Sequence, residues 1–469
     1  MAIPGFGERS ETGLHWLLRE TTMTKRIVMV FFLGCIWASS ASAQVDCTTS
    51  NKLTCLIPFN TRATEPGTVG NQSQAFNASF AAQLSQLPLP SSATGVVFTF
   101  DKKLKLDVPL ENLGPILTDR ARTIGKHRLY LGFSFQQFNF TDINGTSLGQ
   151  VPFVLLSQTT DSNGVVTQQQ YSSEVLKIGF KFNQYVGIVT YGLNANTDVS
   201  LIVPAVRVSV SSGQTVYGPE GYGTQYNVDV ASGKVYPISQ QIPYLAGTAS
   251  GIGDILVNVK HNFTKESRYQ LAAGMLFRFP TGDALNYLGS GAYGFNPYGV
   301  FSYDARVSPH ARIGYIWNTS TVLIQEPSQS GSNCNTTVTP PVCEKAARLP
   351  GGLQYDVGFD AKLIQRVTAA VDLFGSQFQN SPTLALTSVN VKTNPANQIP
   401  TLQSTVLTNS TYIINNFSAG LKWKPFKNYN LLVYGNALFQ LNNVGLRTSA
   451  VPLFGLSYTF CAQFLGCQR

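Results

Sequence analysis

The stretch LQYDVGFDAKL, residues 353–363, indicates the fold because it alternates between large apolar side chains and polar residues or glycine. Strict alternation is the pattern of a β-strand whose two faces meet different surroundings. At eleven residues, the stretch is about twice as long as an ordinary strand of ~5–6 residues. It matches the ~9–11 residues that a strand needs to cross a bilayer.

Eleven further segments of this kind follow one another along the chain. The twelve predicted strands cover residues 127–140, 173–193, 197–210, 254–263, 268–280, 297–307, 310–319, 353–363, 366–376, 412–424, 430–441 and 450–460. An even number of strands of this length is typical of bacterial outer-membrane barrels.

The connections between these strands alternate in length. Short turns are predicted at residues 194–196, 265–267, 308–309, 364–365 and 425–429, and each is followed by a medium or long connection. Outer-membrane barrels have short periplasmic turns and long extracellular loops. The predicted fold class is therefore all-β: a transmembrane antiparallel β-barrel of about twelve strands (12–14), over residues 127–460. Residues 461–469 form a C-terminal tail.

This fold sets the surroundings of the two strand faces. The apolar rows would contact outer-membrane lipid, and the polar rows would face the lumen. The last strand presents an aromatic-rich row, Leu456, Tyr458 and Phe460. Barrel-assembly machinery commonly recognises such a strand, so we expect this machinery to be a partner.

A targeting signal precedes the barrel. Lys25 and Arg26 are followed by an apolar run of eleven residues (27–37) and by the sequence Ala41-Ser42-Ala43. This order is that of a secretory signal peptide. We expect cleavage before Gln44, with residues 1–43 as an N-terminal extension and signal peptide.

Residues 44–126 are too long for a simple tail and are predicted to form a plug inside the barrel or a periplasmic cap. Phe76, Phe80, Leu84 and Leu87 fall on one face of a predicted helix. A hairpin is predicted over 96–108. The stretch that leads into the first strand supplies the plug candidates Asp119, Arg120 and Arg122.

Six cysteines lie after the predicted cleavage site, in three local pairs. Disulfides between neighbours are the simplest arrangement in an exported chain, which gives Cys47–Cys55, Cys334–Cys343 and Cys461–Cys467. Metal binding is the alternative, but the spacing lacks C-x-x-C pairs and nearby histidines.

Composition excludes several other classes. Charged residues make up only 12% of the chain, and the net charge is +9. No basic run or basic patch interleaved with aromatic residues supports nucleic-acid binding. Three histidines, His127, His261 and His310, follow the signal peptide without metal-ligand spacing. We expect no cofactor, no metal and no catalysis.

The polar rows carry more positive than negative charge. Nine basic residues (Lys177, Lys181, Lys260, Arg278, Arg306, Arg312, Lys362, Lys422 and Lys424) oppose five acidic ones (Asp254, Asp304, Asp356, Asp360 and Asp372). A basic lumen favours anions; the alternative is that these charges pair across strands and stabilise the wall. The lumen or transport candidates are Asp254, Lys260, Arg278, Asp283, Asp304, Arg306, Arg312 and Lys362.

Four segments carry a resemblance to a known family: LGPILTDRARTIG (113–125), YGLNANTDVSLIVP (191–204), GIGD (251–254) and RFPTGD (278–283). They resemble the outer-membrane proteins of the MetA pathway of phenol degradation, relatives of FadL-type transporters. The resemblance implies passage of aromatic or other apolar small molecules, and an N-terminal hatch in the lumen.

Three functions remain open from the sequence. The first is passive uptake of small hydrophobic or aromatic solutes, including anionic ones, across the bacterial outer membrane. The second is a general, weakly anion-preferring porin. The third is a surface barrel that binds partners through its loops and transports nothing.

Overall fold

The computed structural model describes residues 51–56, 69–91, 98–101, 106–109, 112–160, 166–217, 225–229, 234–238, 241–264, 268–328, 333–335, 342–389 and 402–461. All of these belong to one compact unit, Gln44–Arg469. The predicted signal peptide and the C-terminal tail after Cys461 lie outside the described residues.

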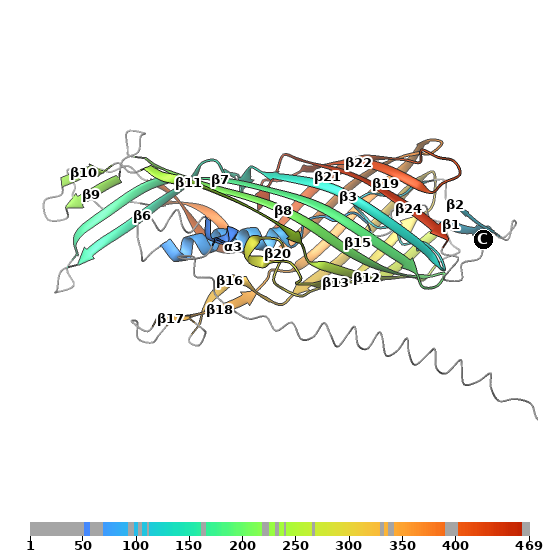
Figure 1. Ribbon diagram of the computed structural model, residues 1–469, viewed down its shortest axis with the longest axis horizontal. Coiled ribbons are helices and arrows are strands. Elements are labelled where there is room, and N and C mark those ends of the chain that lie inside the picture. Colours follow the sequence, from blue (N-terminus) through green and yellow to red (C-terminus); the bar gives the residue numbers. More distant parts are fainter. Residues whose placement is uncertain are drawn as a thin grey trace, which may run out of the picture. The chain divides into compact units, whose positions relative to one another are not determined.

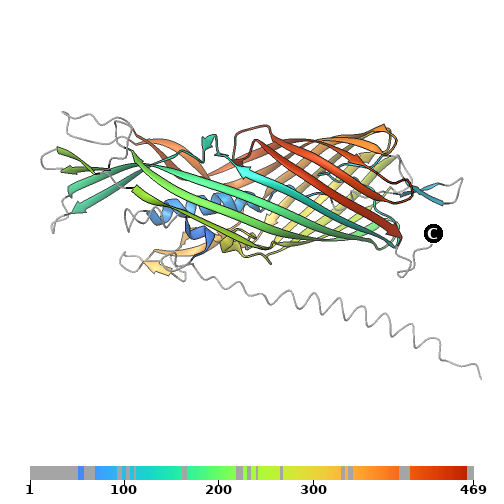
Figure 2. The same ribbon diagram turned by 45° about the horizontal axis from the view of Figure 1, so that its top comes forward.

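Twelve long strands form a closed antiparallel barrel, in which each strand pairs with the next and the last pairs with the first (Figures 1 and 2). The predicted fold class and all twelve predicted strands are confirmed. The barrel strands are β3 (Arg128–Phe140), β7 (Val166–Gly192), β8 (Thr197–Tyr217), β12 (Ile255–Asn262), β13 (Tyr269–Phe279), β14 (Gly294–Tyr303), β15 (Val307–Asn318), β19 (Gly352–Ile364), β20 (Val367–Val389), β21 (Leu402–Trp423), β22 (Leu431–Gln440) and β24 (Ala450–Cys461).

The alternation of strand β19 places its two faces in the predicted surroundings. Val357 and Phe359 are 54% and 45% exposed on the outside, while Asp356 and Asp360 are buried inside. Closure of the barrel pairs every strand on both sides, which is what a sheet needs where water cannot satisfy its backbone. The exposed apolar row is therefore the lipid-facing surface of an outer-membrane barrel.

Placing a charge on this row should destabilise the barrel. For Val357→Arg we expect a loss of ~2–4 kcal/mol, the cost of an arginine near the bilayer midplane. Urea unfolding in lipid vesicles measures it. Val175→Arg is the matched control, because Val175 lies on the same face of β7 as the exposed Lys177, two residues away. Equal losses for both variants would contradict the assigned lipid-facing surface.

One strand turns its predicted faces around. Lys177 and Lys181 of β7 are exposed on the outside, whereas Ile178, Phe180 and Phe182 are buried inside. The prediction that the two lysines face the lumen is wrong. These residues lie in the part of β7 that precedes Tyr185. The inner face of this part packs against a helix instead of facing a water-filled lumen.

That helix is α3 (Val69–Leu84). It lies inside the barrel, at the end that carries the long loops (Figure 2). Phe76 and Phe80 pack against Phe153, Phe180 and other wall residues. The small residues of the remaining faces, such as Ala82, are buried as well. Burial on all sides differs from the predicted single apolar face, because the wall surrounds the helix.

Shorter elements complete the unit. Four strands extend the barrel sheet, the hairpin predicted over 96–108 is present as β1 and β2, and two small sheets and two 3-10 helices lie in connections. Their bounds are β6 Val151–Thr160, β9 Gln225–Asp229, β10 Lys234–Ile238, β11 Gln241–Ile252; β1 Phe98–Asp101, β2 Leu106–Pro109; β4 Asp142–Ile143, β5 Thr146–Ser147, β23 Leu446–Arg447; β16 Ser320–Ser328, β17 Asn333–Asn335, β18 Val342–Arg348; η1 Leu53–Cys55 and η2 Ala284–Asn286.

The cysteine pair in the small sheet is suitably placed for a bond. Cys334 on β17 is the register partner of Cys343 on β18. Residues directly opposite in an antiparallel pair have Cα atoms ~4.5–5.5 Å apart, within the range that a disulfide spans. We expect peptide mapping without reduction to find these two residues linked. Recovery of two separate free-thiol peptides would contradict the pairing.

The two other predicted pairings stay predictions. Cys55 and Cys461 are each disulfide-bonded. Cys47 and Cys467, which the sequence pairs with them, lie outside the described residues.

Candidate functional site in the barrel lumen

Residues 112–124, here called the lumen segment, cross the inside of the barrel at its short-turn end. Two ion pairs hold the segment to the wall. Arg120 pairs with Asp360, and both side chains are buried. Arg122 donates from Nε to Oδ2 of Asp304 at 2.5 Å. The three sequence-predicted plug candidates are Asp119, Arg120 and Arg122. All three lie here, and the two arginines meet the carboxylates of Asp360 on β19 and of Asp304 directly after β14.

Buried wall side chains also bind the backbone of the lumen segment. Lys260 Nζ donates to the carbonyl of Arg120 at 2.9 Å, and Asn262 donates to the carbonyl of Ala121 at 2.8 Å. Lys422 Nζ donates to the carbonyls of Leu113 and Pro115. Irregular backbone at membrane depth is tolerated only where protein or water satisfies its polar groups. These contacts provide that partner set.

A buried histidine joins the same network. His310 Nε2 lies 2.7 Å from Thr118 Oγ1 and 2.8 Å from Asp372 Oδ1. Its Nδ1 lies 3.4 Å from Asp360 Oδ1. Sequence reasoning missed this role because it considered His310 only as a metal ligand or catalytic group, and it also placed a turn at 308–309. β15 instead begins at Val307, and Pro309 is accommodated because pairing with β14 ends at His310.

Apolar side chains of the lumen segment fill the remaining space. Ile116, Ala121 and Ile124 are all fully buried. Ile116 packs on Ala370 and Tyr434, and the other two pack on neighbouring parts of the wall. The segment is thus held by apolar contacts, ion pairs and backbone hydrogen bonds together.

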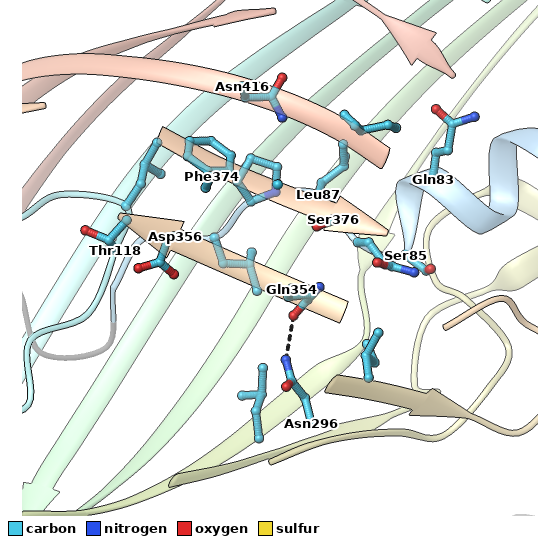
Figure 3. Close-up of a pocket in the computed structure, with 18 of the residues that line it drawn as sticks. Gln83, Ser85, Leu87, Thr118, Asn296, Gln354, Asp356, Phe374, Ser376 and Asn416 are labelled. Atoms are coloured by element: carbon cyan, nitrogen blue, oxygen red, sulfur yellow. Dashed lines mark hydrogen bonds between the residues drawn. The ribbon is translucent and has the colours of Figure 1, made fainter. Parts of the chain in front are cut away.

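A cavity of about 210 Å³ lies between α3 and the lumen segment (Figure 3). Residues 83–91, which connect the helix towards the lumen segment, form one side of it. The opposite side belongs to β13, β14, β15, β19 and β20. Leucine and phenylalanine side chains share the lining with arginine, aspartate and amide groups. Such a mixed lining is usual for small-molecule sites.

Three predicted lumen candidates are held by contacts with loops and connections, and one of them, Arg278, also lines the cavity. Asp254 accepts hydrogen bonds from the backbone of Gly282 and Ser290. Arg278 donates to the carbonyl of Ser85 at 2.7 Å. Asp283 caps η2 and pairs with Lys52 at 2.7 Å. The motif glycines suit this role, because a Cβ on Gly282 would lie 2.7 Å from another backbone.

The remaining candidates divide between cavity and rim. Arg312 lines the cavity, while Lys260 and Asp304 hold the lumen segment. Lys362 lies near the end of β19 beside a second hollow at the short-turn rim. The prediction that Arg306 lies in a strand facing the lumen is wrong. It lies in the exposed turn between β14 and β15, since β14 ends at Tyr303.

The excess of positive charge predicted for the lumen is therefore not present. Of the nine basic residues assigned to the lumen, Lys177 and Lys181 face outward, Arg306 lies in a turn, and Lys424 follows the end of β21. Five basic residues remain. The lumen segment and Asp198 of β8 add charges that the strand pattern did not assign, so most charges meet opposite partners.

The Asp283 carboxyl gives a pH test of the loop. Partial burial alone would raise its pKa, but hydrogen bonds from Lys52 and Asn286 outweigh burial and hold the pKa below its ordinary value. A lowered pKa stabilises the fold above the ordinary pKa and ceases to do so as pH falls through the lowered one.

We therefore expect Asp283→Asn to lower the free energy of unfolding at about pH 6 by less than ~1 kcal/mol, since the pair is partly exposed. At about pH 2 the two proteins should be equally stable. Paired urea titrations at the two pH values measure this. A difference that persists unchanged at the lower pH would contradict the ion pair's role.

No metal-binding cluster of three His, Cys, Asp or Glu side chains occurs among the described residues. Within the same part of the chain, no helix is long and apolar enough to cross a membrane.

Residues 155–339 match the family described as "Putative MetA-pathway of phenol degradation". The resemblance inferred from the sequence is thereby confirmed over these residues, which include the GIGD and RFPTGD motifs. The segment 113–125 lies outside the matched part. No curated protein matches the chain at a significant level.

Solved structures similar to the chain include a channel, a FadL homologue and a transporter. The COG4313 outer-membrane channel from Pseudomonas putida F1 has a TM-score of 0.40 and 10% identity, covering 73% of this chain and 99% of that one. A Pseudomonas aeruginosa FadL homologue has a TM-score of 0.30 and 12% identity, and the match covers 79% of this chain and 96% of that one. The Ralstonia pickettii toluene transporter TbuX has a TM-score of 0.29 and 10% identity, and the match covers 71% of this chain and 89% of that one.

Proposed function

We propose that this outer-membrane β-barrel admits small hydrophobic or aromatic compounds by passive uptake. The observation that carries the proposal is the cavity between α3 and the lumen segment, with its mixed apolar and polar lining. At about 210 Å³ it exceeds the ~150 Å³ apolar cavity known to hold benzene. The family description, which names phenol, agrees with a solute of one ring.

We infer that residues 112–124 act as a plug rather than as part of a periplasmic cap. Buried ion pairs and backbone hydrogen bonds fix this segment across the lumen. A solute entering from the long-loop end would reach the cavity and would leave towards the short turns once the segment shifts. The same contacts speak against the general porin, which needs an open water-filled lumen.

Two further parts of the proposal concern export. We propose that a signal peptide ending at Ala43 directs the chain to the outer membrane and is removed before Gln44. Assembly machinery would then recognise β24. Mass measurement of the protein isolated from outer membranes tests the cleavage point directly.

Uptake by cells that lack their general porins tests the function. Initial rates are measured for radiolabelled toluene and glucose, with the empty vector as control. We expect toluene uptake to rise several-fold while glucose uptake stays at the control rate. A rise in both rates would instead indicate a general porin. No rise in either would indicate a surface barrel without transport.

A further inference from the structure

A polar row runs across one wall of the cavity on three adjacent strands. Asn296 belongs to β14, Arg312 to β15, and Gln354 and Asp356 to β19. Arg312 and Asp356 are register partners, yet their closest charged atoms, Nη1 and Oδ2, lie 3.7 Å apart. That distance is longer than a hydrogen bond. Figure 3 shows Asn296 and Gln354 joined by their 2.6 Å hydrogen bond, with Asp356 on the same strand.

Three buried atoms of this row have no hydrogen-bond partner among the described residues: Arg312 Nε, Asp356 Oδ1 and Asn296 Oδ1. One of them is a donor and two are acceptors. Buried polar atoms in native proteins nearly always have a partner, because leaving one without costs free energy. A solute that both accepts and donates a hydrogen bond would match this set.

Apolar side chains form another part of the lining. They are Leu87 and Leu89 from the connection after α3, and Leu276, Ile316 and Phe374 of the wall. Figure 3 shows Leu87 and Phe374 among the side chains that line the cavity. A flat hydrocarbon ring suits this part, because apolar area removed from water is its main source of binding free energy. The cavity therefore combines an apolar part for a ring with a polar row for one substituent.

Three arginines (Arg278, Arg312 and Arg447) and two aspartates (Asp119 and Asp356) line the cavity. Arg278 has Asp254 beside it at 3.8 Å, and Arg312 has Asp356. Asp119 and Arg447 contribute one charge of each sign. A carboxylate bound at the polar row would meet the Asp356 carboxylate as well as Arg312. Like charges at such distances in a desolvated site repel strongly.

We propose that the cavity binds an uncharged, single-ring compound that carries a hydroxyl group. The hydroxyl donates to Asp356 Oδ1 and accepts from the Arg312 guanidinium, while the ring lies against Leu87 and Phe374. A hydrocarbon makes neither hydrogen bond, and an aromatic carboxylate supplies no proton. This assignment names the solute class of the proposed function and rests on it only for the solute's passage.

Equilibrium dialysis of the purified barrel in lipid nanodiscs tests the assignment, with empty nanodiscs as blank. The ligands are benzyl alcohol, toluene and benzoate, which share the ring and differ in the substituent. We expect benzyl alcohol to bind at least tenfold more tightly than benzoate and more tightly than toluene. Benzoate binding as tight as benzyl alcohol would overturn the assignment.

Two variants separate the roles of the row. Asp356→Asn should weaken the binding of benzyl alcohol and strengthen the binding of benzoate, so that the order of their affinities reverses. Arg312→Gln should weaken the binding of benzyl alcohol without strengthening the binding of benzoate. The control is Lys181→Gln, which lies outside the barrel and should leave the order unchanged. An unchanged order in Asp356→Asn overturns the proposal.

Folding of each variant is checked by its heat-dependent shift on gels. If a variant does not fold, the comparison of three ligands on the unaltered protein still decides. Binding of benzyl alcohol in that order without cellular uptake would support this assignment and overturn the transport function.

Discussion

Replacing Asp360 with alanine is expected to loosen the lumen segment more than any other single change. Asp360 is fully buried, pairs with Arg120 and lies beside His310. Its removal leaves the guanidinium without its carboxylate in a desolvated place. Breaking a buried pair in this way costs ~3–5 kcal/mol. At ~1.4 kcal/mol for each factor of ten, backbone amides of the segment should exchange roughly 100-fold faster or more.

Hydrogen exchange followed by mass spectrometry measures this effect on peptides covering 112–124. The matched control is the double variant Arg120→Met with Asp360→Leu, which removes both charges and keeps apolar volume. Its exchange should lie much closer to that of the unaltered protein. If Asp360→Ala leaves exchange in these peptides unchanged, the ion pair does not hold the segment.

Filling the cavity by Leu87→Trp is expected to lower the rate of toluene uptake at least tenfold. Leu87 lies on the connection after α3 and lines the cavity, as Figure 3 shows. The larger indole would occupy space that a one-ring solute needs. Overpacking a well-packed interior costs ~1–3 kcal/mol, which a barrel closed by backbone pairing on every strand should withstand.

The control for this variant is Leu193→Trp, the same change at a position that is 49% exposed on the outer side. Its uptake rate should equal that of the unaltered protein. Both variants are measured at equal amounts of folded barrel in the outer membrane. Full uptake by Leu87→Trp would show that the solute takes a route that avoids this cavity.

The barrel itself could be predicted because lipid imposes one simple pattern. Residues such as Val357 and Phe359 must alternate with inward groups for as long as the strand crosses the membrane. The same rule failed on β7, where Phe180 and Phe182 face inward. Beyond the lipid belt the outer face meets water and the inner face meets α3, so the apolar row changes sides. Period alone does not record that change.

The sequence predicts which side chains of the site face inward, but it does not predict which residues they contact. Lys260, Asp356 and Asp360 face inward as their strand phase requires. Their partners lie far away in the chain: Arg120 is 240 positions from Asp360. No periodicity connects such positions. His310 begins a predicted strand, but its role was missed for the same reason, since its partners Thr118 and Asp372 lie 192 and 62 positions away.

Single-channel recording of the unaltered protein in planar bilayers tests the central claim most directly. That claim is that a folded segment closes the lumen to ions while a small solute can pass when the segment shifts. We predict no steady conductance from the unaltered barrel, and a steady conductance once residues 113–123 are deleted. A large, steady conductance from the unaltered protein would contradict it, because the lumen would then be open.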